Sequence, residues 1–177
     1  PDGTLAIRTC CPEPDPTPPP VLLALELTWD DIANVPVADA SSVSDWNTFF
    51  DLPTNGTPFT SVTVAGNVVY LYGGGGITLT PDGTDNNRFG YENTSLLKVI
   101  DNAGCIIKIN DYAFSYNDAL TEVYFPGCIE LESAASDGAM NANPLLSIVG
   151  FPNLELLVEY GLSNCAIIDL DLPKCTI

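Results

Sequence analysis

The residues best suited to hold a metal ion lie in one turn-forming segment, Pro81-Asp-Gly-Thr-Asp-Asn-Asn87. Asp82, Asp85 and Asn87 offer carboxylate and amide oxygens, which are the ligands that Ca²⁺ prefers in proteins. The segment lacks the spacing of an EF-hand loop and the Glu that closes one. A metal-free Asx turn explains the same residues and is the interpretation we favour. Ca²⁺ at these three residues is therefore the one candidate cofactor.

Two pairs of carboxylates have the character of a glycosidase dyad, Asp30 with Asp31 and Asp169 with Asp171. The chain holds 23 Asp and Glu, so close pairs arise without a catalytic role, and no neighbouring residue orients either pair. The absence of His excludes Ser-His-Asp and Cys-His arrangements built within the chain. The sequence predicts a non-enzymatic protein, and a carboxylate-based glycoside hydrolase stays the third hypothesis.

The six cysteines show no CxxC spacing, and the lack of His leaves only Cys-only zinc sites, which argues against zinc. Cys10 and Cys11 flank a proline run and are predicted to be exposed, either as reduced thiols, which we favour, or in a bridge between chains. The other four are predicted to be buried free thiols because they fall in apolar positions: Cys105, Cys128, Cys165 and Cys175.

Charge and composition exclude several classes of partner. Five Lys and Arg against 23 Asp and Glu give a net charge of −18, which repels both nucleic acid and anionic lipid. No apolar run reaches the roughly 18 residues of a membrane span. The stretch from Gly73 to Gly76 is followed by no Gly-Lys-Ser/Thr, so we interpret it as a flexible turn and not as a phosphate-binding loop.

The chain is predicted to have three parts: a proline-rich extended linker at 1–20, an N-terminal cap at 21–87 and a repeat region at 88–177. A disordered tail is the alternative for the first part. Within the cap we expect a strand at 21–29, a helix at 44–50 with Ser44 as N-cap, and a strand at 77–79. Between the last two lies a hairpin at 60–71 that turns at Gly66-Asn67. The chain begins at Pro1 without an initiator Met or signal peptide, and we expect it to be part of a longer protein.

A spacing of apolar residues recurs four times in the repeat region. The template is Leu97, Ile100 and Cys105, and steps of 23, 26 and 21 residues lead from Leu97 to its later equivalents. Such steps are typical of leucine-rich repeat coils. The three later copies are Leu120, Val123 and Cys128; Leu146, Val149 and Leu154; and Ile167, Leu170 and Cys175.

Further columns follow the same repeat. Phe125, Phe151 and Leu172 share a column, and a proline follows each of them. A small residue and then a large one precede each copy, at Gly90-Tyr91, Ala113-Phe114, Ala139-Met140 and Gly161-Leu162. A coil of about 23 residues cannot bury its own apolar side, but stacked coils bury one another's. The sequence therefore predicts a mainly β fold with a short leucine-rich-repeat β-solenoid of about four to five coils of 21–26 residues. A further degenerate coil is predicted at Val62, Val68 and Leu71, 38 residues before Ile100, Ile106 and Ile109.

The segment Asp111-Tyr-Ala-Phe-Ser-Tyr-Asn-Asp-Ala-Leu-Thr-Glu-Val-Tyr-Phe-Pro126 resembles the unit of BspA-like leucine-rich repeat proteins. The stretches 140–152 and 162–173 follow it less strictly, and the resemblance covers 88–177. The segment 45–53, leading to 59–64, resembles the cap that such repeats carry in phage virion proteins. The resemblance implies adhesion and surface recognition, and it supplies no catalytic residues.

These observations lead to an expected function. The leading hypothesis is a phage virion surface protein, a spike, fibre or capsid decoration, that serves host attachment or capsid assembly. The alternative is an extracellular adhesin on the bacterial cell surface. The expected partners are other virion or cell-surface proteins and a host surface receptor. Leu170, Leu172 and Ile177 keep the last coil apolar, which predicts a homo-oligomer, a trimer or pentamer.

Overall fold

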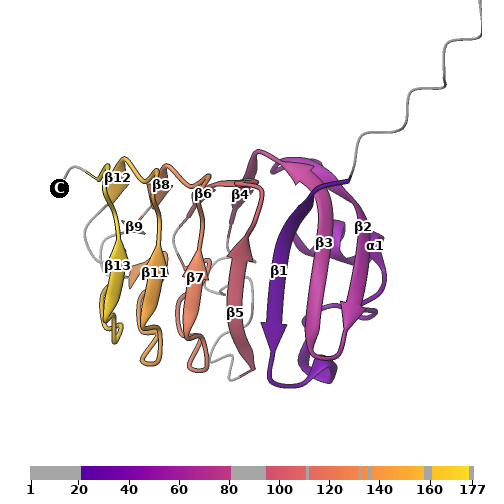
Figure 1. Ribbon diagram of the computed structural model, residues 1–177, viewed down its shortest axis with the longest axis horizontal. Helices are drawn as coiled ribbons and strands as arrows, with labels where there is room; N and C mark the ends of the chain where they lie inside the picture. The colour runs from indigo at the N-terminus through magenta and orange to yellow at the C-terminus, as the bar shows by residue number, and fades with distance from the viewer. Residues whose placement is uncertain are drawn as a thin grey trace, which may run out of the picture.

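The computed structural model describes residues 21–80, 95–110, 112–131, 133–134, 137–157 and 161–175. These residues form a mainly β fold, which confirms that part of the prediction. The larger sheet has seven strands in the order β13-β11-β7-β5-β1-β3-β2, and Figure 1 shows them side by side along the long axis. Its strands are β1 (Leu23–Trp29), β2 (Thr57–Ala65), β3 (Val68–Gly75), β5 (Leu96–Asp101), β7 (Glu122–Tyr124), β11 (Ile148–Gly150) and β13 (Asp169–Asp171).

A second sheet of four strands runs beside the later part of the first, in the order β12-β8-β6-β4. Its strands are β4 (Ile77–Leu79), β6 (Ile106–Ile109), β8 (Glu130–Leu131) and β12 (Leu156–Leu157). The remaining elements are a short antiparallel ladder and two helical turns: β9 (Ser133–Ala134), β10 (Asp137–Gly138), the 3-10 helix η1 (Ile32–Asn34) and α1 (Val43–Phe49). Among the described helices, none is long and apolar enough to cross a membrane.

The strands β1, β2 and β3 form an antiparallel region, and the hairpin of β2 and β3 turns at Gly66-Asn67 as predicted. The prediction for the glycine run is wrong, because Gly73–Gly75 ends strand β3 and pairs with the start of β2. The physical reason is close packing. A Cβ atom at Gly74 would lie 2.9 Å from Cδ1 of Phe59, so the glycine leaves room for an aromatic ring.

The helix α1 packs against β2 and begins earlier than predicted. Its N-cap is Ser42 and not Ser44: the Ser42 hydroxyl accepts from the Asp45 N–H at 3.2 Å and donates to the Asp45 carboxylate at 2.8 Å. Ser42 thereby provides an acceptor for an otherwise free N–H of the first turn, and Ser44 does not serve in this way. Trp46 and Phe50 are buried with ring centroids 6.3 Å apart, and Phe50 meets Phe59 of β2 at 5.5 Å.

The strands β5, β7, β11 and β13 form a parallel region, in which each strand returns beside its predecessor. Val123 of β7 pairs with Val149 of β11, and Val149 pairs with Leu170 of β13. The later strands of the second sheet pair in the same parallel sense, with Leu131 beside Leu157. These pairings confirm the predicted alignment of the last three copies.

The first copy is displaced by one residue from the prediction. The residue beside Val123 is Val99, not Ile100, and the buried leucine that precedes it is Leu96, whereas Leu97 is half-buried. Side chains alternate between the two faces of a strand, so a slip of one residue moves each of them to the other face. The prediction aligned the first copy with the others through Cys105. However, the segment from Val99 to Cys105 is one residue longer than the equivalent segments of the later copies.

The extra coil predicted at Val62, Val68 and Leu71 is wrong. These residues lie in the antiparallel hairpin, where Val62 pairs with Leu71. The strand that precedes β6 in the second sheet is β4, with Ile77 beside Ile106. β-Branched residues occur in both kinds of pairing, so their spacing alone does not distinguish an antiparallel hairpin from a parallel coil.

The turns between the two sheets also stack upon one another. The Phe114 N–H donates to the Ala139 carbonyl at 2.9 Å, and one copy later the Met140 N–H donates to the Gly161 carbonyl at 3.0 Å. This matches the predicted small-and-large column, except that Gly90-Tyr91 lies outside the described residues. Inside, Phe125 stacks on Phe151 with centroids 5.5 Å apart. The core of the parallel region is therefore made of columns of equivalent residues.

Candidate functional site

The outer face of the larger sheet presents side chains that alternate with the buried ones. In the antiparallel region this face carries Glu26 and Tyr70, which are paired neighbours. Further along, Lys98, Glu122, Ile148 and Asp169 form one row across four strands, because the register of the parallel ladders places them side by side. A second row runs in parallel through Ile100, Tyr124, Gly150 and Asp171.

A shallow groove of about 380 Å³ crosses these two rows, and we call it the sheet groove. The Tyr124 ring lies along it, since a Cβ atom at Gly150 would come within 2.5 Å of the Tyr124 Cδ2 atom. Tyr124 is 40% exposed and Ile148 43% exposed, so an apolar floor is open to solvent. Apart from the inward-facing Val123 and Val149, the groove is lined by Ile100, Glu122, Tyr124, Ile148, Gly150, Asp169 and Asp171.

The charges of the sheet groove are unevenly distributed. The Lys98 ammonium group contacts the Glu122 carboxylate and neutralises that charge. Asp169 and Asp171 are exposed at the other end of the groove, and neither is part of an ion pair among the described residues. The groove therefore has an apolar centre, one neutralised end and one negative end.

The structure treats the two predicted carboxylate pairs differently. Asp169 and Asp171 lie two residues apart on one face of β13 and join Glu122 at the sheet groove. Asp31 caps η1 by accepting from the Ala33 N–H at 3.0 Å. Asp30 accepts from the side chain of Asn34 at 3.2 Å, and this hydrogen bond lowers the pKa of its carboxyl group. The first pair lines the sheet groove, and the second belongs to a turn.

The candidate calcium ligands Asp82, Asp85 and Asn87 lie outside the described residues. Within the part of the chain that the structure describes, no group of three or more Cys, Asp or Glu side chains is arranged to hold a metal ion. The Ca²⁺ prediction thus stays a prediction.

The predicted buried thiols are placed in two environments. Cys105 and Cys128 are buried, while Cys165 and Cys175 are half-buried, and all four are free. Burial raises the pKa of the Cys128 thiol to about 12, and it raises that of Cys105 further, with the negative charge of buried Asp101 adding to the effect. Thiols held neutral in this way are poor nucleophiles. Cys10 and Cys11 lie outside the described residues.

The spacing of apolar residues does not predict a buried column of polar residues in the turns. The Asn143 carboxamide accepts from the Asn117 N–H at 2.8 Å and donates to the Met140 carbonyl at 2.7 Å. One copy later Cys165 takes the same place, and its thiol donates to the Met140 carbonyl at 3.1 Å. The recurring Asn three residues before Leu120 and Leu146 was the available signal. This column holds the turns in place and does no chemistry of its own.

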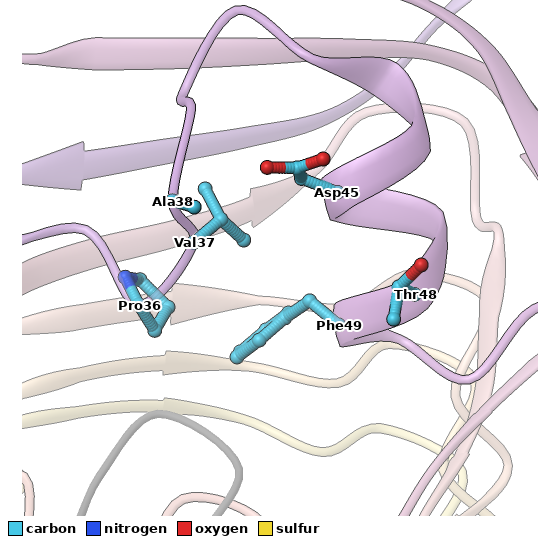
Figure 2. A pocket seen from close by; sticks show the side chains of 6 residues that line it. All are labelled: Pro36, Val37, Ala38, Asp45, Thr48 and Phe49. Carbon is cyan, nitrogen blue, oxygen red and sulfur yellow. The ribbon is translucent and has the colours of Figure 1, made fainter.

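A smaller hollow of about 270 Å³ lies between α1 and the loop that precedes it. Its carboxylate, from Asp45, already accepts hydrogen bonds from the Asp39 N–H at 3.1 Å and the Ser42 hydroxyl. The hollow therefore lies at the start of the helix, and its one carboxylate is already hydrogen-bonded there. Figure 2 shows its lining: Pro36, Val37, Ala38, Asp45, Thr48 and Phe49.

Comparisons of the chain with protein-family models, with curated proteins and with solved structures found no match.

Proposed function

We propose that this chain is a non-enzymatic structural and recognition protein that meets its partner through the outer face of the larger sheet. The observation that carries the proposal is the sheet groove, where Tyr124 and Ile148 are held exposed on strands whose inner side chains are fully buried. Exposed aromatic and aliphatic side chains on a rigid scaffold are typical of recognition surfaces. The groove is shallow and open, which suits a partner surface better than an enclosed substrate.

The architecture we propose is a short leucine-rich-repeat β-solenoid of the BspA-like kind, at 88–177, joined to a cap at 21–87 and a proline-rich linker at 1–20. Support comes from backbone hydrogen bonds that join successive copies at three kinds of place. Two are the parallel ladders of the two sheets, and the third runs through the turns at Phe114 and Met140. Buried columns of equivalent residues are what stacked coils require.

The proposed location is the surface of a phage virion, in a spike, fibre or capsid decoration. The resemblance to BspA-like repeats and to their phage-borne cap supports this location, and the net charge of −18 disfavours a nucleic acid partner. The alternative is an adhesin on the bacterial cell surface, to which the same groove applies.

Exposed apolar residues at the edge strands support assembly of several copies. Ile168 is 86% exposed and Leu170 48% exposed beside β13, and Leu156 of β12 is 46% exposed. Apolar patches of this kind are buried in homo-oligomers with closed symmetry, and we propose a trimer or pentamer. Light scattering of the complete protein tests this, because a monomer over the whole micromolar range contradicts it.

Immunogold electron microscopy tests the location. Antibodies raised against the chain should label purified virions if the phage proposal holds, and the envelope of bacterial cells if the adhesin alternative holds. Label in the cytoplasm alone overturns both.

Variants of the outer face test the recognition role. Tyr124→Ala with Ile148→Ser should reduce binding of the complete protein to its target cells by about thirtyfold or more, because truncation of central aromatic and aliphatic contacts costs more than about 1 kcal/mol each. The matched control is Ile129→Ser, which removes an equally exposed isoleucine from beside the second sheet. Equal losses in both variants, or none, contradict the proposal.

A further inference from the structure

The polar groups of the sheet groove share one property, which restricts what can bind there. The side chains of Glu122, Asp169 and Asp171 are carboxylates, and an ionised carboxylate accepts hydrogen bonds but donates none. Among the described residues, no Asn, Gln, Ser or Thr lines the groove, and the Tyr124 hydroxyl is the one side-chain donor in its lining. A ligand that satisfies this lining must bring mainly donors.

The shape of the groove adds a second restriction. The Tyr124 ring lies over the buried Gly150 and forms a flat apolar step. Ile100 and Ile148 flank this step. A flat cation stacks on a tyrosine ring, and its aliphatic stem packs on isoleucine side chains.

Resting on the proposed function, we infer that the sheet groove binds an arginine-bearing extended segment of a partner protein. A guanidinium group has five donors and no acceptor, it is planar, and it pairs with carboxylates in a two-pronged geometry. It therefore complements both the carboxylate acceptors of the lining and the flat step beside Tyr124. Asp169 and Asp171 provide the unpaired charge, and the net charge of −18 attracts cationic segments from a distance.

A neutral oligosaccharide fits the same lining less well. Sugar hydroxyls both donate and accept, so a sugar site normally provides both kinds of group, and the carboxylates of this groove would leave sugar acceptors unpaired. Glu122 is already engaged by Lys98, which leaves two carboxylates at one end rather than a ring of polar groups.

The test uses three blocked peptides: acetyl-Leu-Arg-Gly-Arg-Leu-amide, its lysine counterpart, and its citrulline counterpart, which has nearly the shape of arginine without the charge. Binding to the complete chain is followed by amide NMR shifts at about 0.15 M salt, where long-range attraction is screened. The arginine peptide should shift amides of β7, β11 and β13. It should bind at least about threefold more tightly than the lysine peptide, since lysine lacks the planar fork. The citrulline peptide should not bind.

Matched variants distinguish binding at the sheet groove from attraction to the total negative charge of the chain. Asp169→Asn with Asp171→Asn should weaken binding of the arginine peptide about tenfold, or about 1.4 kcal/mol. Asp51→Asn with Asp118→Asn removes the same charge from exposed positions away from the sheet groove and should change binding less than about twofold. All four residues are exposed, and unchanged melting temperatures would show that the fold is kept.

Three outcomes overturn the inference. Equal losses in the two double variants would mean that only the total charge acts. Binding of the citrulline peptide would mean that the charge does not act. Groove shifts caused by maltohexaose or chitohexaose, without any caused by the arginine peptide, would assign the groove to a sugar. If Tyr124→Ala with Ile148→Ser abolishes cell binding while the arginine peptide fails to bind, the sheet groove is a recognition surface, as proposed, but its ligand is not an arginine-bearing segment.

Discussion

The antiparallel region and the parallel region share one sheet, yet their interiors are built differently. In the antiparallel region unlike elements meet: Phe50, the residue that follows α1, packs on Phe59 of β2, and one hairpin turn sets the register. In the parallel region each side chain meets its own equivalent, as Phe125 meets Phe151. The two regions join where Leu27 of β1 pairs with Val99 of β5.

This difference determines which changes each region tolerates. A column of equivalent residues accepts either Leu or Cys at a given position, as Cys128 and Leu154 show, because that position requires only an apolar side chain. It does not accept a shift of register, since each strand pairs in register with the equivalent strand of the next copy. The antiparallel region has no such repetition, so each of its contacts is made once and a local fault stays local.

The largest expected effect distinguishes two adjacent leucines of β5. Leu96→Ala should lower the free energy of unfolding by about 2–5 kcal/mol, because a fully buried side chain is lost from a column. Leu97→Ala should cost less than about 1 kcal/mol, since Leu97 is half-buried on the other face. Urea denaturation followed by circular dichroism measures both. A larger loss for Leu97 would restore the register predicted from the sequence and refute the one described here.

A somewhat smaller effect is expected from the polar column of the turns. Asn143→Ala removes the partner of the Asn117 N–H, and a buried N–H left unpaired costs about 1–3 kcal/mol. It also leaves the Met140 carbonyl with only the weak thiol donor of Cys165. Cys165→Ala should cost less, because a thiol is a weak donor and the Met140 carbonyl keeps its bond from Asn143. Thermal and urea melts of both variants give the comparison. If Cys165→Ala proves the more damaging, the turns do not depend on this column.

A pH-dependent effect follows from the raised pKa of Cys128. The folded protein keeps the thiol proton up to a pKa of about 12, whereas the unfolded chain releases it near 9.0. The stabilisation is complete below pH 9 and declines as the pH rises from 9 toward 12, by about 1.4 kcal/mol per pH unit for this thiol. Between pH 8 and about pH 10.5, the unfolding free energy of the wild type should fall by about 2 kcal/mol more than that of Cys128→Leu, because only the roughly 1.5 pH units above 9 contribute. An equal decrease in both proteins would contradict it.

Labelling of the native protein with a thiol reagent provides an independent check. Cys105 and Cys128 should react only after unfolding, because both are buried and neutral. Rapid modification of Cys128 in the folded state would mean that the parallel region opens readily.

The sequence predicted much of the parallel region because its contacts repeat. Once Leu120 and Leu146 were aligned, Val123 with Val149 followed, and the structure has these pairs. The error at Leu97 arose where β5 meets the antiparallel region. There the column that holds Phe125 and Phe151 holds Asp101, whose carboxylate accepts from the Cys105 and Ile106 N–H groups at 2.9 Å. In the first copy a hydrogen-bonded carboxylate thus takes the place of a stacked apolar side chain. The spacing of apolar residues does not predict this replacement.

The candidate site was harder to predict than the fold. Outward residues such as Tyr124 and Ile148 obey no repeat, because neighbouring coils impose no requirement on them. The sequence indicated Asp169 and Asp171 as a pair, but these residues follow Glu122 by 47 and 49 residues in the chain. They lie near Glu122 because β11 pairs with β7 on one side and with β13 on the other. Only the register of three strands brings these residues together.

The smallest expected effect tests whether faults in the antiparallel region stay local. Gly66 turns the hairpin with φ of +62°, and a Cβ atom there would meet nothing within 4 Å. Gly66→Ala should therefore cost only the backbone strain of that φ, about 1 kcal/mol, and Gly66→Asn less, since Asn tolerates this conformation. Gly127 is a useful contrast, because a Cβ atom there would collide with the backbone of Gly104 in the neighbouring copy. Hydrogen exchange should show faster opening of β2 and β3 in Gly66→Ala, with β7 and β11 unchanged. Faster exchange in β11 would mean that the hairpin register is transmitted along the whole sheet, and that the two regions do not respond separately.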